Sequence, residues 1–181
     1  MVKPTFKNRE NIAHKIDGKE VWESRSSAVN TVVLGIFKDS IFVLTEKRSA
    51  TMPDEPGKWC IPSGYFDYDE DAAENAIREI WEETGLYLPD FKNDLVYASP
   101  VNKPFLVQTS PKENRQNIIL YYCYIYDFYK GLPDVEKYKN KEIDQAKWME
   151  ISEVFTDKYV WAFNHDLRIE EAVNEFQKYL I

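Results

Sequence analysis

Three glutamates near the middle of the chain could hold a divalent metal ion. Glu79, Glu82 and Glu83 are related as i, i+3 and i+4, so on an α-helix their side chains lie on one stripe. Like charges at this spacing repel one another, and a bound cation would offset the repulsion. Oxygen ligands without histidine or cysteine favour Mg²⁺ or Mn²⁺ over zinc, and Mg²⁺ takes one or two carboxylates together with substrate phosphates. The stripe therefore indicates a place where metal meets a phosphate compound, whereas a lone glutamate pair would be a solvated helix face.

The residues around the stripe indicate how such a helix is oriented. Arg78 stands four residues before Glu82 and can fix the orientation of a carboxylate. Glu70 would face away from Glu79 on a straight helix, so it could reach a metal only from the preceding loop or the first turn. An adjacent sector of the helix is apolar and can be buried; it consists of Ala73, Ala76, Ile77 and Ile80.

The whole segment from Gly64 to Leu86 resembles the Nudix box, Gly-x5-Glu-x7-Arg-Glu-U-x-Glu-Glu-x-Gly-U with U bulky and apolar, and every fixed position is filled. The preceding segment, Gly57 to Gly64, is similar to the usual Gly-x-Trp-x-x-Pro-Gly-Gly, with Ser63 in place of the first of the two final glycines. The resemblance implies an α/β protein with the Nudix fold, an α/β/α sandwich around a mixed β-sheet. It also implies hydrolysis of a nucleoside diphosphate linked to another moiety, by water attack on phosphorus.

The resemblance implies roles for residues of the box, with Mg²⁺ or Mn²⁺ as the cofactor. Glu79 and Glu83 are the expected principal ligands, and the full predicted metal site is Glu79, Glu83, Glu82, Gly64 and Glu70. The predicted catalytic residues are Glu82, Glu83, Arg78 and Glu142. The general base comes either from the box or from a later loop, where Glu142 is the candidate; the alternative for Glu142 is an ordinary surface glutamate.

Basic and aromatic residues beside the box are candidates for substrate binding. Lys47, Arg48 and Lys58 are expected near phosphate, Arg48 foremost by position, and Arg115 is a further candidate. Tyr65 could stack on a nucleobase. The alternatives are solvated surface cations and a core aromatic residue.

Composition predicts one cytoplasmic domain spanning residues 1–181. The chain has 181 residues, 44% of them hydrophobic, which is enough for one substantial core. It contains no apolar run as long as the ~20 residues of a membrane span, and its start is too polar for a secretory signal. The two cysteines, Cys60 and Cys123, fit reduced thiols in a core. The net charge of −8 argues against broad nucleic-acid binding, although a metal-loaded site can still bind small anions.

Hydrophobic patterning predicts the elements that position these residues. Strands are expected at 28–37, 41–45, 95–97 and 118–126, with an edge strand at 147–151 and a loop at 49–57. Asp69 is the candidate N-cap of the box helix, and Gly85 is expected to end it. A C-terminal helix at 166–181 is predicted from a stripe formed by Ile169, Val173, Phe176 and Leu180. Residues 1–24 could be an appended strand, a homodimer arm or a tail.

Three functional hypotheses remain. The first is a metal-dependent pyrophosphohydrolase of a small nucleotide, such as a nucleoside triphosphate or ADP-ribose. The second is an enzyme acting on a capped RNA 5′ end, which would need a basic groove. The third is a non-catalytic nucleotide sensor that uses the same pocket. Neither His14 nor His165 has the spaced partners of a zinc ligand.

Overall fold

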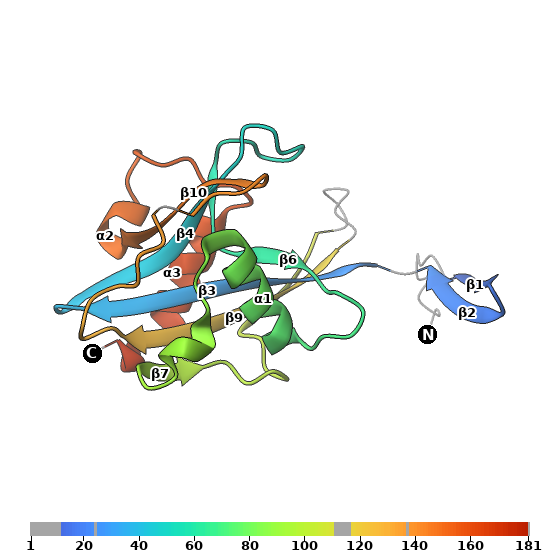
Figure 1. Cartoon of the computed structure of the whole chain (residues 1–181), viewed down its shortest axis with the longest axis horizontal. Helices are drawn as coiled ribbons and strands as arrows, with labels where there is room; N and C mark the ends of the chain where they lie inside the picture. Colours follow the sequence, from blue (N-terminus) through green and yellow to red (C-terminus); the bar gives the residue numbers. More distant parts are fainter. Residues whose placement is uncertain (1–11, 24, 111–116, 137, 181) are drawn as a thin grey trace, which may run out of the picture.

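A mixed β-sheet forms the centre of the protein in the computed structural model, which describes residues 12–23, 25–110, 117–136 and 138–180 (Figure 1). The main strand order is β10-β4-β3-β9-β7, with β5 on β4, β6 on β3 and β8 on β9. β3 and β9 pair in parallel, and the other pairs of this sheet are antiparallel. The bounds are β3 Ser27–Phe37, β4 Ser40–Arg48, β5 Trp59–Cys60, β6 Ser63–Tyr65, β7 Leu95–Ala98, β8 Leu106–Thr109, β9 Ile118–Asp127 and β10 Ile143–Glu150.

Helices cover both faces of this sheet, which confirms the predicted α/β/α sandwich. α1 (Ala72–Thr84) lies on one face and α3 (His165–Glu175) on the other (Figure 1). Shorter helical segments complete the described chain: η1 Leu88–Phe91, α2 Ile151–Val154 and η3 Gln177–Tyr179.

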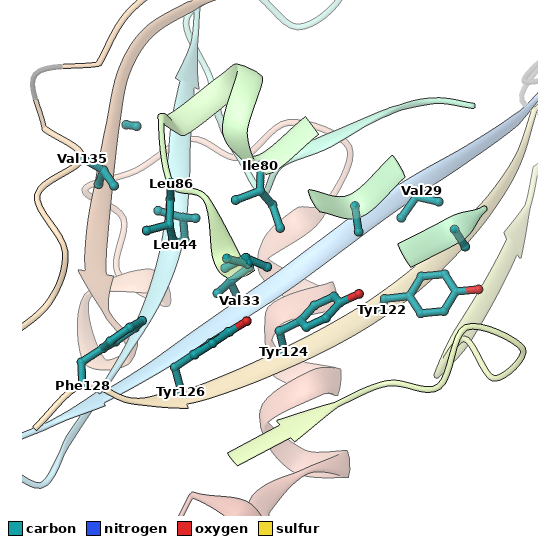
Figure 2. Close-up of a cluster of buried hydrophobic side chains, with 14 residues drawn as sticks. Val29, Val33, Leu44, Ile80, Leu86, Tyr122, Tyr124, Tyr126, Phe128 and Val135 are labelled. Carbon is teal, nitrogen blue, oxygen red and sulfur yellow. The ribbon is translucent and has the colours of Figure 1, made fainter. Parts of the chain in front are cut away.

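Alternation along the two central strands creates two hydrophobic clusters. On β3, Val29 and Val33 join the cluster beneath α1, whereas Val32 and Leu34 join the cluster beneath α3. Figure 2 shows Ile80 of α1 above the first of these faces. Because both faces are covered, the strands are almost continuously apolar, and this pattern made them recognisable from sequence.

The predicted strands are confirmed, with changes at their ends. β4 continues to Arg48, three residues beyond the predicted 41–45, because β10 and β5 both pair with this extension. The edge strand begins at Ile143 rather than 147, and Ile151 already belongs to α2. The C-terminal helix begins at His165 and ends at Glu175, followed by η3, while its predicted apolar stripe packs in the second cluster. The sequence did not predict β5, β6 or β8.

Asp71, rather than Asp69, caps the helix that carries the glutamates. Its Oδ1 accepts hydrogen bonds from the backbone N–H groups of Ala73 (2.8 Å) and Glu74 (3.0 Å), and Glu74 Oε2 in turn accepts from the Asp71 N–H (2.8 Å). This reciprocal capping box satisfies three otherwise unpaired donors, which is why the cap lies two residues later than predicted. Gly85 ends the helix as expected, at φ 73°.

A separate hairpin precedes the sheet. β1 (Ile12–Ile16) and β2 (Lys19–Glu23) form a two-stranded sheet that lies apart from the main one in Figure 1. A two-stranded hairpin is only marginally stable by itself and would gain from packing against another surface. The homodimer arm stays a prediction. Positions 1–11 and 24 of the predicted extension lie outside the described residues.

Both cysteines are buried free thiols, as predicted. Within the described residues, no helix has the length and apolar character needed to cross a membrane.

Candidate functional site

A cavity of about 590 Å³ lies beside the N-terminal half of β3. Its walls come from α1, β6, the loop that follows β4, and the segment before α3. The cavity brings together seven of the predicted site residues: Arg48, Lys58, Gly64, Tyr65, Glu79, Glu83 and Glu142. It does not include Lys47, Glu70, Arg78 or Glu82 in its lining, and Arg115 lies outside the described residues.

Glu79 and Glu83 present their carboxylates where α1 meets β6. Oε2 of Glu83 accepts a hydrogen bond from the Ser63 N–H at 2.8 Å. The Glu79 carboxylate lies directly over Gly64, where the Cβ of any other residue would overlap it. Close approach of a carboxylate, and not a left-handed φ, therefore favours glycine at this position, since any larger residue would displace the Glu79 carboxylate.

Arg78 organises the carboxylates around the cavity. Its Nη1 donates to Glu79 Oε1 (2.7 Å) and to Glu82 Oε2 (3.1 Å), and its Nη2 donates to the Tyr65 carbonyl (3.0 Å). Its Nε and Nη2 also donate to the two oxygens of Glu70, at 2.9 and 2.6 Å. Planar guanidinium groups bind carboxylates in this bidentate manner, which fixes the orientation of both partners.

Glu70, before the helix, and Glu82, in its last turn, therefore lie beside Arg78 rather than in the cavity wall. The hydrogen bonds from Arg78 lower the pKa of Glu70 to about 2, and the Asp67 N–H also donates to its carboxylate. The Glu82 side chain is 48% exposed beside Arg78. Their predicted roles as metal ligands stay predictions, and in this arrangement Glu70 anchors Arg78.

Glu46 is a buried acid of the site for which the sequence reasoning predicted no role. It lies on β4, and its Oε1 accepts a hydrogen bond from Cys60 Sγ at 3.2 Å. Its Oε2 is buried without a hydrogen bond of good geometry among the described residues, and it faces the carboxyl group of Glu83. The only signal in the sequence was a charged residue directly after the apolar run 41–45 of a predicted strand.

Burial makes ionisation of this cluster costly. Loss of solvation raises the pKa of Glu46 to about 7 and raises that of Glu83 well above its ordinary value, with mutual repulsion adding to the effect on Glu83. The pKa of Glu79 is also raised by burial, against the opposing effect of Arg78. Negative charge here needs a cation to stabilise it.

The donors present fit a hard divalent cation. Two carboxylates face the cavity beside the backbone of Gly64, and all of these groups offer oxygen. Within the described parts of the chain, no three acidic, histidine or cysteine side chains are already grouped as a complete metal site. Two protein carboxylates are nevertheless the usual number for Mg²⁺, which completes its shell with water and phosphate oxygens. Glu79 and Glu83 could therefore hold Mg²⁺ or Mn²⁺ at this edge of the cavity.

Of the basic residues predicted to bind substrate, Arg48 and Lys58 line the cavity and Lys47 does not. Arg48 lines the cavity, where its Nε donates to the Asp54 carbonyl (3.1 Å) and its guanidinium lies 5.2 Å from the centre of the Phe163 ring. Lys58 also lines it and forms an ion pair with Glu55. Lys47 alternates with Arg48 along β4 and is directed to the other side of the strand.

The α3 side of the cavity contains residues that the sequence did not single out as a site. Asn30 of β3 hydrogen-bonds His165, the first residue of α3, and Phe163 packs against the same imidazole at 5.6 Å between ring centres. Tyr121 of β9 and Trp161 also contribute to the lining. These residues come from distant parts of the chain, so no local pattern could have indicated them.

Comparisons with known proteins agree with the geometry. A family model described as the NUDIX domain matches residues 26–168. The protein described as the m7GpppN-mRNA hydrolase NUDT17 of Homo sapiens is 31% identical over 75 residues, which are 41% of this chain and 23% of that relative. The chain therefore matches less than a quarter of that relative's length.

Solved structures show the same fold. A MutT/nudix family protein from Enterococcus faecalis superposes with a TM-score of 0.66 at 17% identity, over 86% of this chain and 63% of that one. The NUDIX domain of Shewanella oneidensis NrtR, complexed with ADP ribose, superposes with a TM-score of 0.59 at 19% identity, over 84% of this chain and 89% of that one.

Proposed function

The chain belongs to the Nudix hydrolase family, and from this membership we propose that it is a metal-dependent pyrophosphohydrolase of a small nucleotide. The observation that carries the proposal is the convergence of Glu79 and Glu83 with Gly64 in a cavity that Arg48 and Lys58 also line. Acidic ligands for a cation and basic groups for phosphate thus occur in one cavity. A nucleoside diphosphate joined to a second group is a substrate of the right size for such a cavity.

The carboxylates are held in place by neighbouring donors. Ser63 donates its N–H to Glu83, and Arg78 holds Glu79 while itself anchored by Glu70. A bound Mg²⁺ would polarise the phosphate, neutralise developing charge and lower the pKa of a bound water. Because these ligands are oriented before substrate arrives, little reorganisation is needed during the reaction.

The remaining groups bind phosphate and accept the proton. Arg48 presents a guanidinium to the cavity, which suits a phosphate oxygen pair. Glu142 is our candidate for the general base, because it reaches the cavity from a loop whose backbone is tied to Ser49 (2.6 Å) and to the Asn140 side chain (2.8 Å). An exposed carboxylate near the phosphate can take the proton of the attacking water.

Two substrate classes have specific support. The complex of the NrtR domain with ADP ribose favours a nucleotide sugar. The match to the relative described as an mRNA hydrolase favours a capped RNA end as a second candidate. The net charge of −8 weighs against a long nucleic acid and favours the small nucleotide.

The test is hydrolysis of a substrate panel by the full chain with Mg²⁺, Mn²⁺ or EDTA. The panel contains nucleoside triphosphates, 8-oxo-dGTP, ADP-ribose, NADH, dinucleoside polyphosphates and capped RNA. We expect metal-dependent release of a nucleoside monophosphate from at least one small nucleotide. Preferred cleavage of capped RNA would instead select the second candidate, and tight binding without cleavage would indicate a sensor.

Variants connect the activity to the site. Glu79→Gln and Glu83→Gln should each keep the fold while lowering turnover by roughly 100-fold or more, because each loses a metal ligand. Glu170→Gln, an exposed change on α3, is the matched control and should retain wild-type turnover. Near-normal turnover in both cavity variants would refute the assigned metal site.

A further inference from the structure

One polar side chain in the cavity has its hydrogen-bonding direction fixed by the protein. Asn30 is 5% exposed and lies on the α3 side of β3, where its amide nitrogen, Nδ2, is 2.9 Å from Nε2 of His165. The Ile61 N–H donates to the other imidazole nitrogen, Nδ1, at 3.2 Å. A nitrogen that accepts a hydrogen bond carries no proton, so the imidazole is neutral and its proton is on Nε2.

This tautomer determines which atom of the Asn30 amide faces the histidine. With Nδ2 of Asn30 against a protonated Nε2, two donors would meet, so the amide must be turned by 180° to bring its oxygen to Nε2. The NH₂ group then takes the opposite position. Within the described part of the chain, Asn30 has no other side-chain hydrogen bond, and it lines the cavity. Gln108, another amide in the lining, differs because its Oε1 accepts from Tyr121 (2.9 Å) and its NH₂ faces Ser110 (3.4 Å). Asn30 therefore offers the cavity a donor that the protein does not use.

The segment that holds His165 in place is strained. Phe163 and Asn164 have φ values of 56° and 58°, in the left-handed region. Asparagine tolerates this region, but a bulky aromatic residue there is a true outlier. Phe163 lines the cavity, and its ring centre lies 5.2 Å from the Arg48 guanidinium and 5.6 Å from the centre of the His165 imidazole. Strain of this kind persists where a precise surface is needed for a ligand.

We propose that Asn30 is a specificity-determining residue that donates a hydrogen bond to an acceptor on the edge of a nucleobase lying against Phe163. This inference rests on the proposed nucleotide substrate and specifies its class: a base with an oxo group at the edge that Asn30 reads. An amino group at the same place would bring two donors together and leave both unpaired in a largely buried position, which costs binding energy. The cavity therefore prefers hypoxanthine or guanine over adenine, and uracil over cytosine.

Matched nucleotide pairs test the inference without catalysis. The affinities of the full chain for IMP and AMP, and for UMP and CMP, are measured calorimetrically in EDTA. Each pair keeps its ring system and phosphate while an oxo group is exchanged for an amino group. We expect roughly tenfold tighter binding of the oxo member in at least one pair, corresponding to about one hydrogen bond.

Asn30→Asp supplies the decisive comparison. A carboxylate still accepts from His165 but has only acceptors for the ligand, so the preference should reverse toward the amino member. The ratio within each pair cancels the effect of the added charge on phosphate binding. Asn30→Ala should bring the ratio near one, and it serves as the test if Asn30→Asp does not fold. Asn93→Asp, which changes an exposed amide in a turn, should leave both ratios unchanged.

The outcomes separate this inference from the proposed function. Equal affinities within both wild-type pairs, a wild-type preference for the amino members, or ratios that neither Asn30 variant changes would overturn the assignment. Absence of binding by all four nucleotides would overturn it together with the proposed substrate class. Base-selective binding that reverses in Asn30→Asp, in a protein that hydrolyses nothing in the panel, would support Asn30 and overturn the hydrolase activity alone.

Discussion

Replacing Glu46 with glutamine should stabilise the metal-free protein at neutral and alkaline pH. The carboxyl group is fully buried on β4, and burial raises its pKa to about 7. A group whose pKa is higher in the folded than in the unfolded state contributes stability below its unfolded pKa and loses it as the pH rises through the folded pKa. At pH 8.5 the wild type therefore carries a buried charge, which glutamine lacks.

The size of the effect follows from the change in pKa. A rise from 4.5 to about 7 corresponds to about 3 kcal/mol over the whole titration, at 1.36 kcal/mol for each pKa unit. About 2 kcal/mol of this falls between pH 5.5 and 8.5. Glutamine has nearly the same shape, can accept from the Cys60 thiol and can donate to Glu83, so packing is retained.

The assay is urea unfolding in EDTA, followed by tryptophan fluorescence at pH 5.5, 7.0 and 8.5. The difference in unfolding free energy between Glu46→Gln and the wild type should rise by about 2 kcal/mol in favour of the variant from pH 5.5 to pH 8.5. Glu83 titrates in both proteins, but loss of the Glu46 charge also lowers the pKa of Glu83, so the difference between the proteins reports the titration of the coupled pair. Glu170→Gln should follow the wild type at every pH. Parallel pH profiles for Glu46→Gln and the wild type would refute a buried, titrating Glu46.

Three further changes test the supports of the site. Gly64→Ala adds a methyl group that overlaps the Glu79 carboxylate, so Mn²⁺ affinity measured by electron paramagnetic resonance should fall roughly tenfold, and an unchanged affinity would contradict the close approach. Arg78→Lys cannot hold its carboxylate partners and a carbonyl together, so turnover should fall roughly 10- to 100-fold; equal turnover would show that orientation by the guanidinium is unimportant. Asp71→Ala removes the helix cap and should lower the unfolding free energy by about 1 kcal/mol, whereas Asp69→Ala should change it little if the cap is correctly assigned.

The sequence predicted the acidic helix because its residues lie within one element. Spacing alone, however, treats Glu79, Glu82 and Glu83 alike, whereas the structure buries Glu83 and leaves Glu82 48% exposed at its side chain. These glutamates differ in whether they lie on the side of the helix that faces the sheet. Glu83 stands three residues after Ile80, which is fully buried, so it follows the buried sector toward the sheet.

The other half of the cavity could not be predicted because tertiary contacts alone assemble it. Asn30 and His165 are 135 positions apart and meet only because α3 packs beneath β3. The polar sequence neighbours of His165 gave no indication that it would be buried. The sequence also did not predict the left-handed conformation of Phe163 and Asn164, because neither residue is a glycine, the usual indicator of a positive φ.

Several departures from ordinary packing rules occur around this cavity. Buried acids occur at Glu46 and Glu83, and a bulky residue takes a left-handed conformation at Phe163. The helix that carries Glu83 has, by contrast, a complete cap at each end. Each departure destabilises the free protein, and a cation among the carboxylates or a base against the ring would offset it. If that is the reason they persist, metal and nucleotide together should raise the melting temperature by more than the sum of their separate effects, because the phosphate links the two halves of the cavity.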